Sequence, residues 1–365
     1  MRKLAAVIAI MLMATAFIAG CQAGGGLKYG MVTDAGTIDD KSFNQGVWEG
    51  LDQAGKEFKF EPKYLNPGAT QPVKADYVKQ MTNLYDTGYK FMVLPGFKFA
   101  SAVYDLQEKY KDDKNAKFVC IDYTPANDDG NDPKVGPNTV VVTFAEHQSG
   151  FLAGIATAMQ LKEGEIGFIG GMQIPAVQKF NWGFQQGVKY AADNLGTKCF
   201  MKPEHVIYEG TFNNVAGGQQ LAATMFDAGC KAIFCAAGGV GVGAINEAMT
   251  RAKAGQEVWI VGVDGDQYKD GLWDDAKTKS VVITSAMKGV KAATYAMVKA
   301  NIDGKFPGGQ SIVMDAANDG IGIPATNPNL SKEVTDKVAQ IFADLKAGKI
   351  VVADTADNLI EPVKK

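Results

Sequence analysis

Short apolar runs alternate with longer amphipathic stretches along nearly the whole chain, and this alternation constrains the fold more than any other feature. Between the runs, stripes of apolar residues recur at helical spacing. Strands separated by helices imply right-handed βαβ crossovers and parallel sheets. We therefore predict an α/β fold. The apolar runs lie at residues 27–33, 89–95, 117–123, 139–144, 165–170, 206–208, 232–236, 258–264 and 281–285.

The runs divide into two groups of similar length, which predicts two doubly wound, Rossmann-like lobes with parallel sheets. A chain of 365 residues also exceeds what one hydrophobic core usually holds. We expect the first lobe to contain residues 27–146 and 287–316, and the second to contain 147–286 and 317–365. The chain would then cross between the lobes three times. Ligands of such folds bind beyond the carboxyl ends of the strands.

The N-terminus has the pattern of an export signal. Two basic residues precede an apolar run over residues 4–18, which is shorter than a membrane span. Small residues then lead to Cys21, an arrangement that resembles the lipobox of bacterial lipoproteins. We expect residues 1–20 to be a signal peptide and residues 21–26 a lipid tether that begins at an acylated Cys21. The protein would be lipid-anchored on the extracytoplasmic side of the cell membrane. An ordinary secretory signal followed by a buried cysteine is the alternative.

Charge and cysteine usage limit the possible partners. Without the two N-terminal basic residues, 35 Lys and Arg face 40 Asp and Glu, a balance that argues against nucleic acid. The chain has no CxxC pair, and its two histidines are His147 and His205, so we expect no metal site. Export would permit a disulfide between Cys199 and Cys230, which the sequence leaves open.

Charged residues stand at the ends of several predicted strands, where a ligand would bind. Asp122 and Asp264 each close an apolar run, and Lys288 follows another. A carboxylate such as Asp264 can accept two hydrogen bonds from vicinal hydroxyls. Lys288 can donate to the same sugar or compensate Asp264. Surface salt bridges are the alternative for both residues. Phe43, at the start of the first predicted helix, could face the cleft or pack in the core.

Four motifs in a fixed order carry a family resemblance. They are DDKSFNQ at residues 39–45, HQSGFLAG at 147–154, FxxGFxxG at 180–187 and GVDxDQ at 262–267. Together they resemble the basic membrane protein family of lipoproteins, which includes purine nucleoside receptors of ABC transporters. The similarity covers essentially the whole mature chain. It implies a type I periplasmic binding protein fold with a three-crossover hinge that closes on its ligand.

The resemblance also implies a role for each candidate residue. Phe43 and Phe180 would stack on the base, with Phe212 as a rival for the second position. Carboxylates would read the edge of the base, and Asp264 with Lys288 would bind the ribose. The closed protein, expected to be a monomer without cofactor or catalysis, would dock on a membrane permease. The candidate ligand-binding residues are Asp34, Ser42, Phe43, Asn44, Asp122, Phe180, Phe212, Gly238, Asp264 and Lys288.

Several alternatives stay open at this point. The same fold could bind a sugar or another small polar ligand, and a lipoprotein could also act as an adhesin or surface antigen. Residues 239–244 read GVGVGA after a predicted strand, and Asp264 follows twenty residues later, which satisfies a dinucleotide-binding fingerprint. Its late position and the predicted export disfavour a dehydrogenase. The hydrolase motif GxSxG is absent, and the acidic loop at 128–132 fails the EF-hand spacing.

Overall fold

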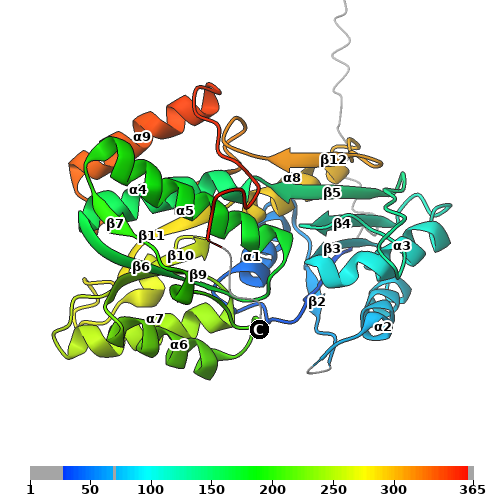
Figure 1. Ribbon diagram of the computed structural model, residues 1–365. Helices are drawn as coiled ribbons and strands as arrows, with labels where there is room; N and C mark the ends of the chain where they lie inside the picture. The colour runs from blue at the N-terminus through cyan, green and yellow to red at the C-terminus, as the bar shows by residue number, and fades with distance from the viewer. Residues whose placement is uncertain (1–27, 69–70, 361–365) are drawn as a thin grey trace, which may run out of the picture.

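The first of two α/β lobes is built on a six-stranded parallel sheet (Figure 1). The computed structural model describes residues 28–68 and 71–360. Helices α1 (Phe43–Phe58) and α8 (Val290–Ile302) pack together on one face, and α2 (Lys74–Asp86) and α3 (Ala100–Lys109) cover the other. In sheet order, the strands are β12 (Ser311–Met314), β5 (Thr139–Phe144), β4 (Lys117–Ile121), β3 (Phe91–Pro95), β1 (Tyr29–Val32) and β2 (Lys63–Leu65).

The second lobe is built on a seven-stranded sheet that is parallel except for β13. Helices α4 (Glu146–Leu161), α5 (Pro175–Leu195) and α9 (Lys332–Lys346) lie on one side, and α6 (Val215–Asp227) and α7 (Gly239–Lys253) lie on the other (Figure 1). The strand order is β13 (Ile321–Gly322), β11 (Val282–Lys288), β10 (Trp259–Asp264), β9 (Cys230–Ala236), β6 (Glu163–Gly170) and β7 (Lys198–Phe200), with β8 (Val206–Tyr208) also paired to β6.

The predicted α/β fold with parallel sheets is confirmed, and every predicted strand overlaps an observed one. Strands β2, β7, β12 and β13 were not predicted. Each has two to four residues, and each lies at the end of a sheet order. Strands this short bury too few side chains to produce a recognisable apolar run, and β2, β7 and β12 are also partly exposed.

Four glycines bring the backbones of α4 and α5 into direct contact. A Cβ placed on any of them would lie 1.9–2.4 Å from a backbone oxygen of the opposite helix, so no larger residue fits. The two glycine motifs at residues 147–154 and 180–187 are therefore explained by the close packing of this helix pair. The four are Gly150, Gly154, Gly183 and Gly187.

The chain passes between the sheets at Ala145, at Gly289 and through residues 315–320. Met287 and Lys288 are the last residues of β11 and pair within the second sheet. The return to the first lobe therefore begins at Gly289, two residues later than the start at 287 that the sequence predicts. With the second crossing moved to Gly289, we propose the same two-lobe division of the chain that the sequence predicts.

The disulfide between Cys199 and Cys230, which the sequence leaves open, does not form in the structure. Both thiols are free and buried. The cysteines lie on β7 and β9, which flank β6 on opposite sides and pair with Gly164 and Glu165 respectively. Two strand spacings, about 9.5 Å, exceed the Cα separation that a disulfide allows.

The predicted signal peptide, the acylated Cys21 and the tether all lie outside the described residues. Among the residues that the structure describes, no helix combines the length and the hydrophobicity that a membrane crossing requires.

Candidate ligand-binding pocket

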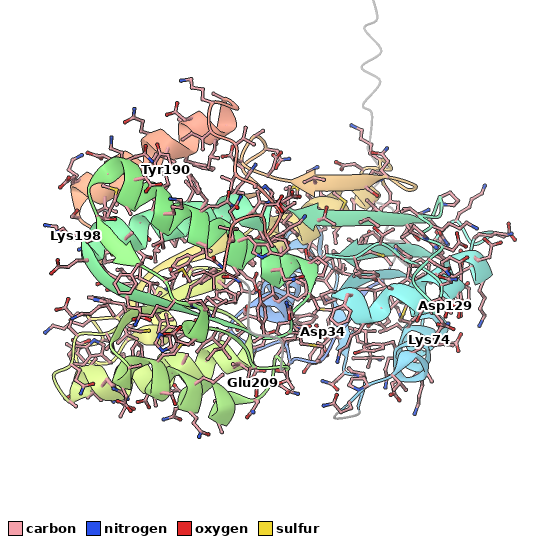
Figure 2. All side chains as sticks on the ribbon, viewed as in Figure 1. Asp34, Lys74, Asp129, Tyr190, Lys198 and Glu209 are labelled. Atoms are coloured by element: carbon pink, nitrogen blue, oxygen red, sulfur yellow. The ribbon has the colours of Figure 1, made fainter. Side chains whose placement is uncertain are left out.

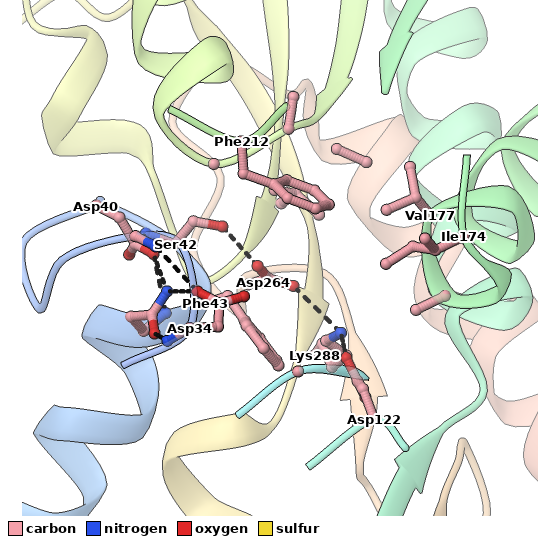
Figure 3. Close-up of a pocket in the computed structure, with 18 of the residues that line it drawn as sticks. Asp34, Asp40, Ser42, Phe43, Asp122, Ile174, Val177, Phe212, Asp264 and Lys288 are labelled. Carbon is pink, nitrogen blue, oxygen red and sulfur yellow. Dashed lines mark hydrogen bonds and ion pairs between the residues drawn. The ribbon is translucent and has the colours of Figure 1, made fainter. Parts of the chain in front are cut away.

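A pocket with an empty volume of about 800 Å³, partly open to solvent, lies between the two lobes. The structure brings all ten candidate residues to its walls. Figure 3 shows polar side chains on one side and apolar ones on the other. Residues that the sequence did not single out also line it: Gly36, Asp40, Gly96, Phe97, Ile174, Pro175, Ala176, Val177, Ala236, Ala237 and Val263.

The carboxyl ends of four strands supply unusual backbone conformations to this pocket. Asp122 follows β4 with φ of 70°, and Asp264 ends β10 with φ of 63°. Gly96, after β3, and Gly238, after β9, also have positive φ. Glycine and aspartate are among the residues that tolerate this left-handed region best. Such conformations cluster at functional sites.

Lys288 is the centre of a buried charge cluster at the junction of the lobes. Its side chain is 4% exposed, and its ammonium forms an ion pair with Asp122. The carboxylates of Glu146 and Asp264 lie 3.7 and 3.8 Å from Nζ. The same nitrogen lies 4.7 Å from the ring centre of Phe43. One cation is thus shared by three carboxyl groups and faces an aromatic ring.

The pKa values in this cluster follow from burial and charge. Burial opposes the charged form of Lys288, but the three carboxylates outweigh it and raise the pKa of the amine. Burial raises the pKa of Glu146 to about 8, against the attraction of Lys288. Burial also raises the pKa of Asp122, although Lys288 is in direct contact. Between Asp122 and Glu146, we assign the negative charge to Asp122, since its carboxylate lies closer to the Lys288 ammonium. Glu146 then has a neutral carboxyl group at neutral pH.

Asp122 has an unused acceptor. Its Oδ2 contacts Lys288, whereas Oδ1 is buried and has no hydrogen-bond partner among the described residues. A buried acceptor without a partner costs about 1–3 kcal/mol. Because Asp122 lines the pocket, a donor on a ligand can remove this cost.

The first lobe adds a hydrogen-bonded loop before α1. Asn44 donates from Nδ2 to Asp34 Oδ1 and to Asp40 Oδ2, both at 2.9 Å. Asp40 also accepts from the backbone amides of Ser42, Asn44 and Gln45. Burial raises the pKa of Asp40 to about 6. Asp40 also lines the pocket, a place that the sequence did not predict for it.

The second lobe contributes an apolar wall. Ile174 and Val177 stand at the start of α5, and Phe212 faces them from the loop before α6 (Figure 3). Phe180 lines the pocket too, but it is only 2% exposed and packs edge-to-face on Phe234 at 5.9 Å. Phe180 is therefore also a core residue.

Direct contacts tie the lobes together across the pocket. Ser42 donates a 2.5 Å hydrogen bond to Asp264 Oδ2, and Gln267 donates from Nε2 to the Lys41 carbonyl at 2.8 Å. Asp264 thus receives one partner from each side, Ser42 from the first lobe and Lys288 from β11. These contacts join the two lobes across the pocket.

The glycine-rich run at 239–244 opens α7 after β9, as the dinucleotide fingerprint requires, but Gly243 of this run serves helix packing. A Cβ on Gly243 would lie 1.9 Å from the Val215 carbonyl, and one on Gly218 would lie 1.9 Å from the Val240 carbonyl. The run therefore explains how α6 and α7 approach each other.

The acidic loop at 128–132 lies at the outer end of the first lobe, where Figure 2 labels Lys74 and Asp129, far from Asp34 between the lobes. Lys74 pairs with Asp128 and Asp105, both at 2.7 Å. A surface ion-pair network accounts for the charges of Asp128 and Asp105.

Comparison with known proteins identifies the family. The family model Bmp, described as ABC transporter substrate-binding protein PnrA-like, matches residues 27–355. The chain belongs to the Bmp family. The resemblance predicted from the four motifs is therefore confirmed. Proteins of this family are substrate-binding components of ABC transporters and not enzymes, which implies a membrane permease as partner and a position outside the cytoplasm.

Three similar proteins illustrate the match. The ABC transporter nucleoside-binding protein BmpA of Lactococcus lactis subsp. cremoris is 31% identical, over 96% of this chain and 99% of its own length. The CD4+ T-cell-stimulating antigen of Listeria innocua is 31% identical, over 89% and 87%. A solute-binding protein of an ABC transporter system from Aeropyrum pernix K1 superposes with a TM-score of 0.75 over 91% of this chain and 95% of its own, at 21% identity. It shows the fold alone.

Proposed function

We propose that this Bmp-family protein binds a nucleoside, in the first place a purine nucleoside, in the interlobe pocket and delivers it to an ABC permease. The observation that carries the proposal is a pocket with phenylalanines on its walls and with Asp122 in its lining, whose buried Oδ1 has no hydrogen-bond partner among the described residues. A nucleoside supplies both complements, since it has a flat base and several hydrogen-bond donors. The relative from Lactococcus lactis bears a name that specifies nucleoside binding.

Each side of the pocket has a proposed part. Phe43 and either Phe180 or Phe212 stack on the base, at about 1–3 kcal/mol per base. Asp34 and Asp122 accept hydrogen bonds from the edge of the base, and Asp264 with Lys288 binds the ribose hydroxyls. Ser42, Asn44 and Gly238 shape the wall around them. A ligand that satisfies both lobes shifts the hinge equilibrium toward the closed form.

We also propose that Cys21 is acylated after removal of residues 1–20. The family match begins at residue 27, directly after the proposed tether. Labelled palmitate should enter the full chain in a bacterial host, and Cys21→Ser should abolish the label. Label retained in that variant would place the lipid elsewhere.

Calorimetric titration of the refolded chain from Gln22 onward tests the ligand. The panel is inosine, guanosine, adenosine, cytidine, ribose, hypoxanthine and NAD. Refolding is needed because a binding protein can retain its ligand through purification. Micromolar or tighter binding of a purine nucleoside, with little response to ribose or free base, is the expected result. Binding of ribose alone would indicate a sugar receptor. If none of the compounds binds, the nucleoside proposal is wrong.

A further inference from the structure

Three side chains able to bind a metal meet at the amino ends of strands in the second sheet, at the opposite edge from the pocket. They are Glu165 on β6, His205 at the end of the 3₁₀ helix Pro203–His205 before β8, and Cys230 at the start of β9. One ligand atom from each lies within 4.8 Å of the others. Both β8 and β9 pair with β6, so paired strands hold the three in place.

A β-bulge aims the cysteine at this cluster. Glu165 pairs with Cys230, but the next residue, Ile166, pairs with Ala232, so Lys231 is an extra residue in β9. In an unbroken strand, Cys230 would point to the same face as Ala232, because side chains alternate with a period of two. The two instead belong to hydrophobic clusters on opposite faces of the sheet. Bulges commonly redirect a side chain in this way near functional sites.

The cluster is buried and its atoms face one another. The side chains of Glu165 and His205 are 6% and 11% exposed, and Cys230 is 2% exposed. His205 Nδ1 contacts Glu165 Oε1 directly and lies 3.4 Å from Cys230 Sγ. Lys202 binds the other carboxylate oxygen, Oε2, at 2.7 Å, which leaves Oε1 turned toward the other two groups.

We propose that Glu165, His205 and Cys230 bind Zn²⁺, with water as the fourth ligand. Thiolate, imidazole and carboxylate are the zinc ligands of proteins, at about 2.0–2.3 Å from the metal, which sets tetrahedral ligand atoms roughly 3.3–3.8 Å apart. The distance of 3.4 Å between Cys230 Sγ and His205 Nδ1 already fits. Glu165 Oε1 and His205 Nδ1 lie closer together than this ligand spacing, so the two atoms have to move apart by about 1 Å when the metal binds.

The charges of the ligands also suit the ion. The thiolate and the carboxylate offset the two charges of the dication, the Lys202 ammonium on Oε2 leaves one positive charge beside the site, and binding releases the thiol proton to solvent. The site could not be predicted from the sequence because Glu165 and His205 are 40 residues apart and Cys230 follows 25 residues later, without a local ligand spacing. The ion would tie β6, β9 and the segment before β8 together, independently of the pocket.

Cobalt titration of the metal-free full chain, made without a histidine tag, tests the site. One equivalent of Co²⁺ should produce a thiolate-to-cobalt charge-transfer absorption that Zn²⁺ abolishes by displacement. Binding of Co²⁺ without this absorption, or no binding, would overturn the proposal. On the same unaltered protein, stoichiometric Zn²⁺ should raise Tm, and an unchanged Tm would also overturn it.

Variants locate the ligands. Cys230→Ser and His205→Ala should weaken Zn²⁺ binding at least about 100-fold, since loss of an outer partner alone costs 10–100-fold. Cys199→Ser is the matched control, because Cys199 is also buried but lies on β7 outside the cluster. Equal affinity in Cys230→Ser and Cys199→Ser would contradict the assignment. Circular dichroism of each variant at the titration temperature confirms that the comparison is made between folded proteins.

Discussion

The two lobes meet the pocket in different ways. The first lobe offers a loop in which Asp34, Asp40 and Asn44 are fixed by hydrogen bonds before any ligand arrives. The second offers an apolar wall that includes Ile174, Val177 and Phe212. Directed polar groups discriminate between ligands, because a mismatched partner leaves them unpaired. Apolar surface attracts any flat ligand of the right size. We propose that recognition of the base depends mainly on the first lobe, while the second adds apolar affinity and, through Asp264 and Lys288, recognition of the ribose.

The largest effect is expected at Lys288, which ends β11 of the second lobe and forms an ion pair with Asp122 of the first lobe. Lys288→Met should abolish nucleoside binding and lower the free energy of unfolding by about 3–5 kcal/mol, because three buried carboxyl groups lose their cation. Calorimetry and denaturant unfolding measure the two effects. Lys291→Met is the control, since Lys291 forms an exposed pair with Glu49 and its loss should cost at most about 1 kcal/mol. A Lys288→Met protein with normal binding would contradict the proposed site.

A change in the apolar wall should affect all nucleosides alike. Phe212→Ala should weaken every nucleoside by about 10–100-fold, the loss of one stacking surface. Phe212 is better suited to this test than Phe180, since truncating the buried Phe180 would also cost about 3–5 kcal/mol of stability. Phe200→Ala, on the exposed face of β7, is the control. A loss of affinity confined to nucleosides with one particular base would show that Phe212 contributes to selectivity as well as to affinity.

A change in the first-lobe loop should alter selectivity more than affinity. Asp34→Asn exchanges an acceptor for a donor, so nucleosides with a proton on the base edge, such as inosine and guanosine, should lose about tenfold relative to adenosine. The ratio of Kd values for inosine and adenosine measures this effect. An unchanged ratio, together with lower affinity for both, would mean that Asp34 does not read the base.

The last prediction concerns pH and tests stability rather than ligand binding. Because the pKa of Glu146 is raised to about 8, its neutral form favours the folded state fully below about pH 4.5, and that contribution is lost as pH rises toward 8. Glu146→Gln stays neutral and should therefore show a smaller fall of Tm between pH 5 and pH 8. Calorimetric scans of both proteins measure it, with Glu49→Gln as an exposed control. Identical slopes in all three would mean that Glu146 is ionised throughout.

The sequence predicts much of this arrangement, for identifiable reasons. Asp122 and Asp264 end apolar runs, and the rule that ligands bind at carboxyl ends of parallel strands places both at the pocket. Asp40, Phe97 and Ile174 were missed as wall residues because no periodic pattern distinguishes a loop side chain that turns toward a ligand. The charge cluster was seen only in part, since the approach of Glu146 to Lys288 depends on how two hinge crossings pack. Short edge strands carry too little apolar surface to be recognised.

The left-handed backbone at Asp122 and Asp264 has a consequence for how this site can evolve. Most side chains are strained at such positions, which glycine, asparagine and aspartate adopt most readily, although four lysines of the described chain also occupy them. Substitutions that keep the strand ends intact can therefore remove the charge or the whole side chain, but they cannot readily introduce a larger group. New ligand preferences in this lineage would then be expected to arise through the loop before α1 and the apolar wall, while the two strand ends change rarely and in small steps.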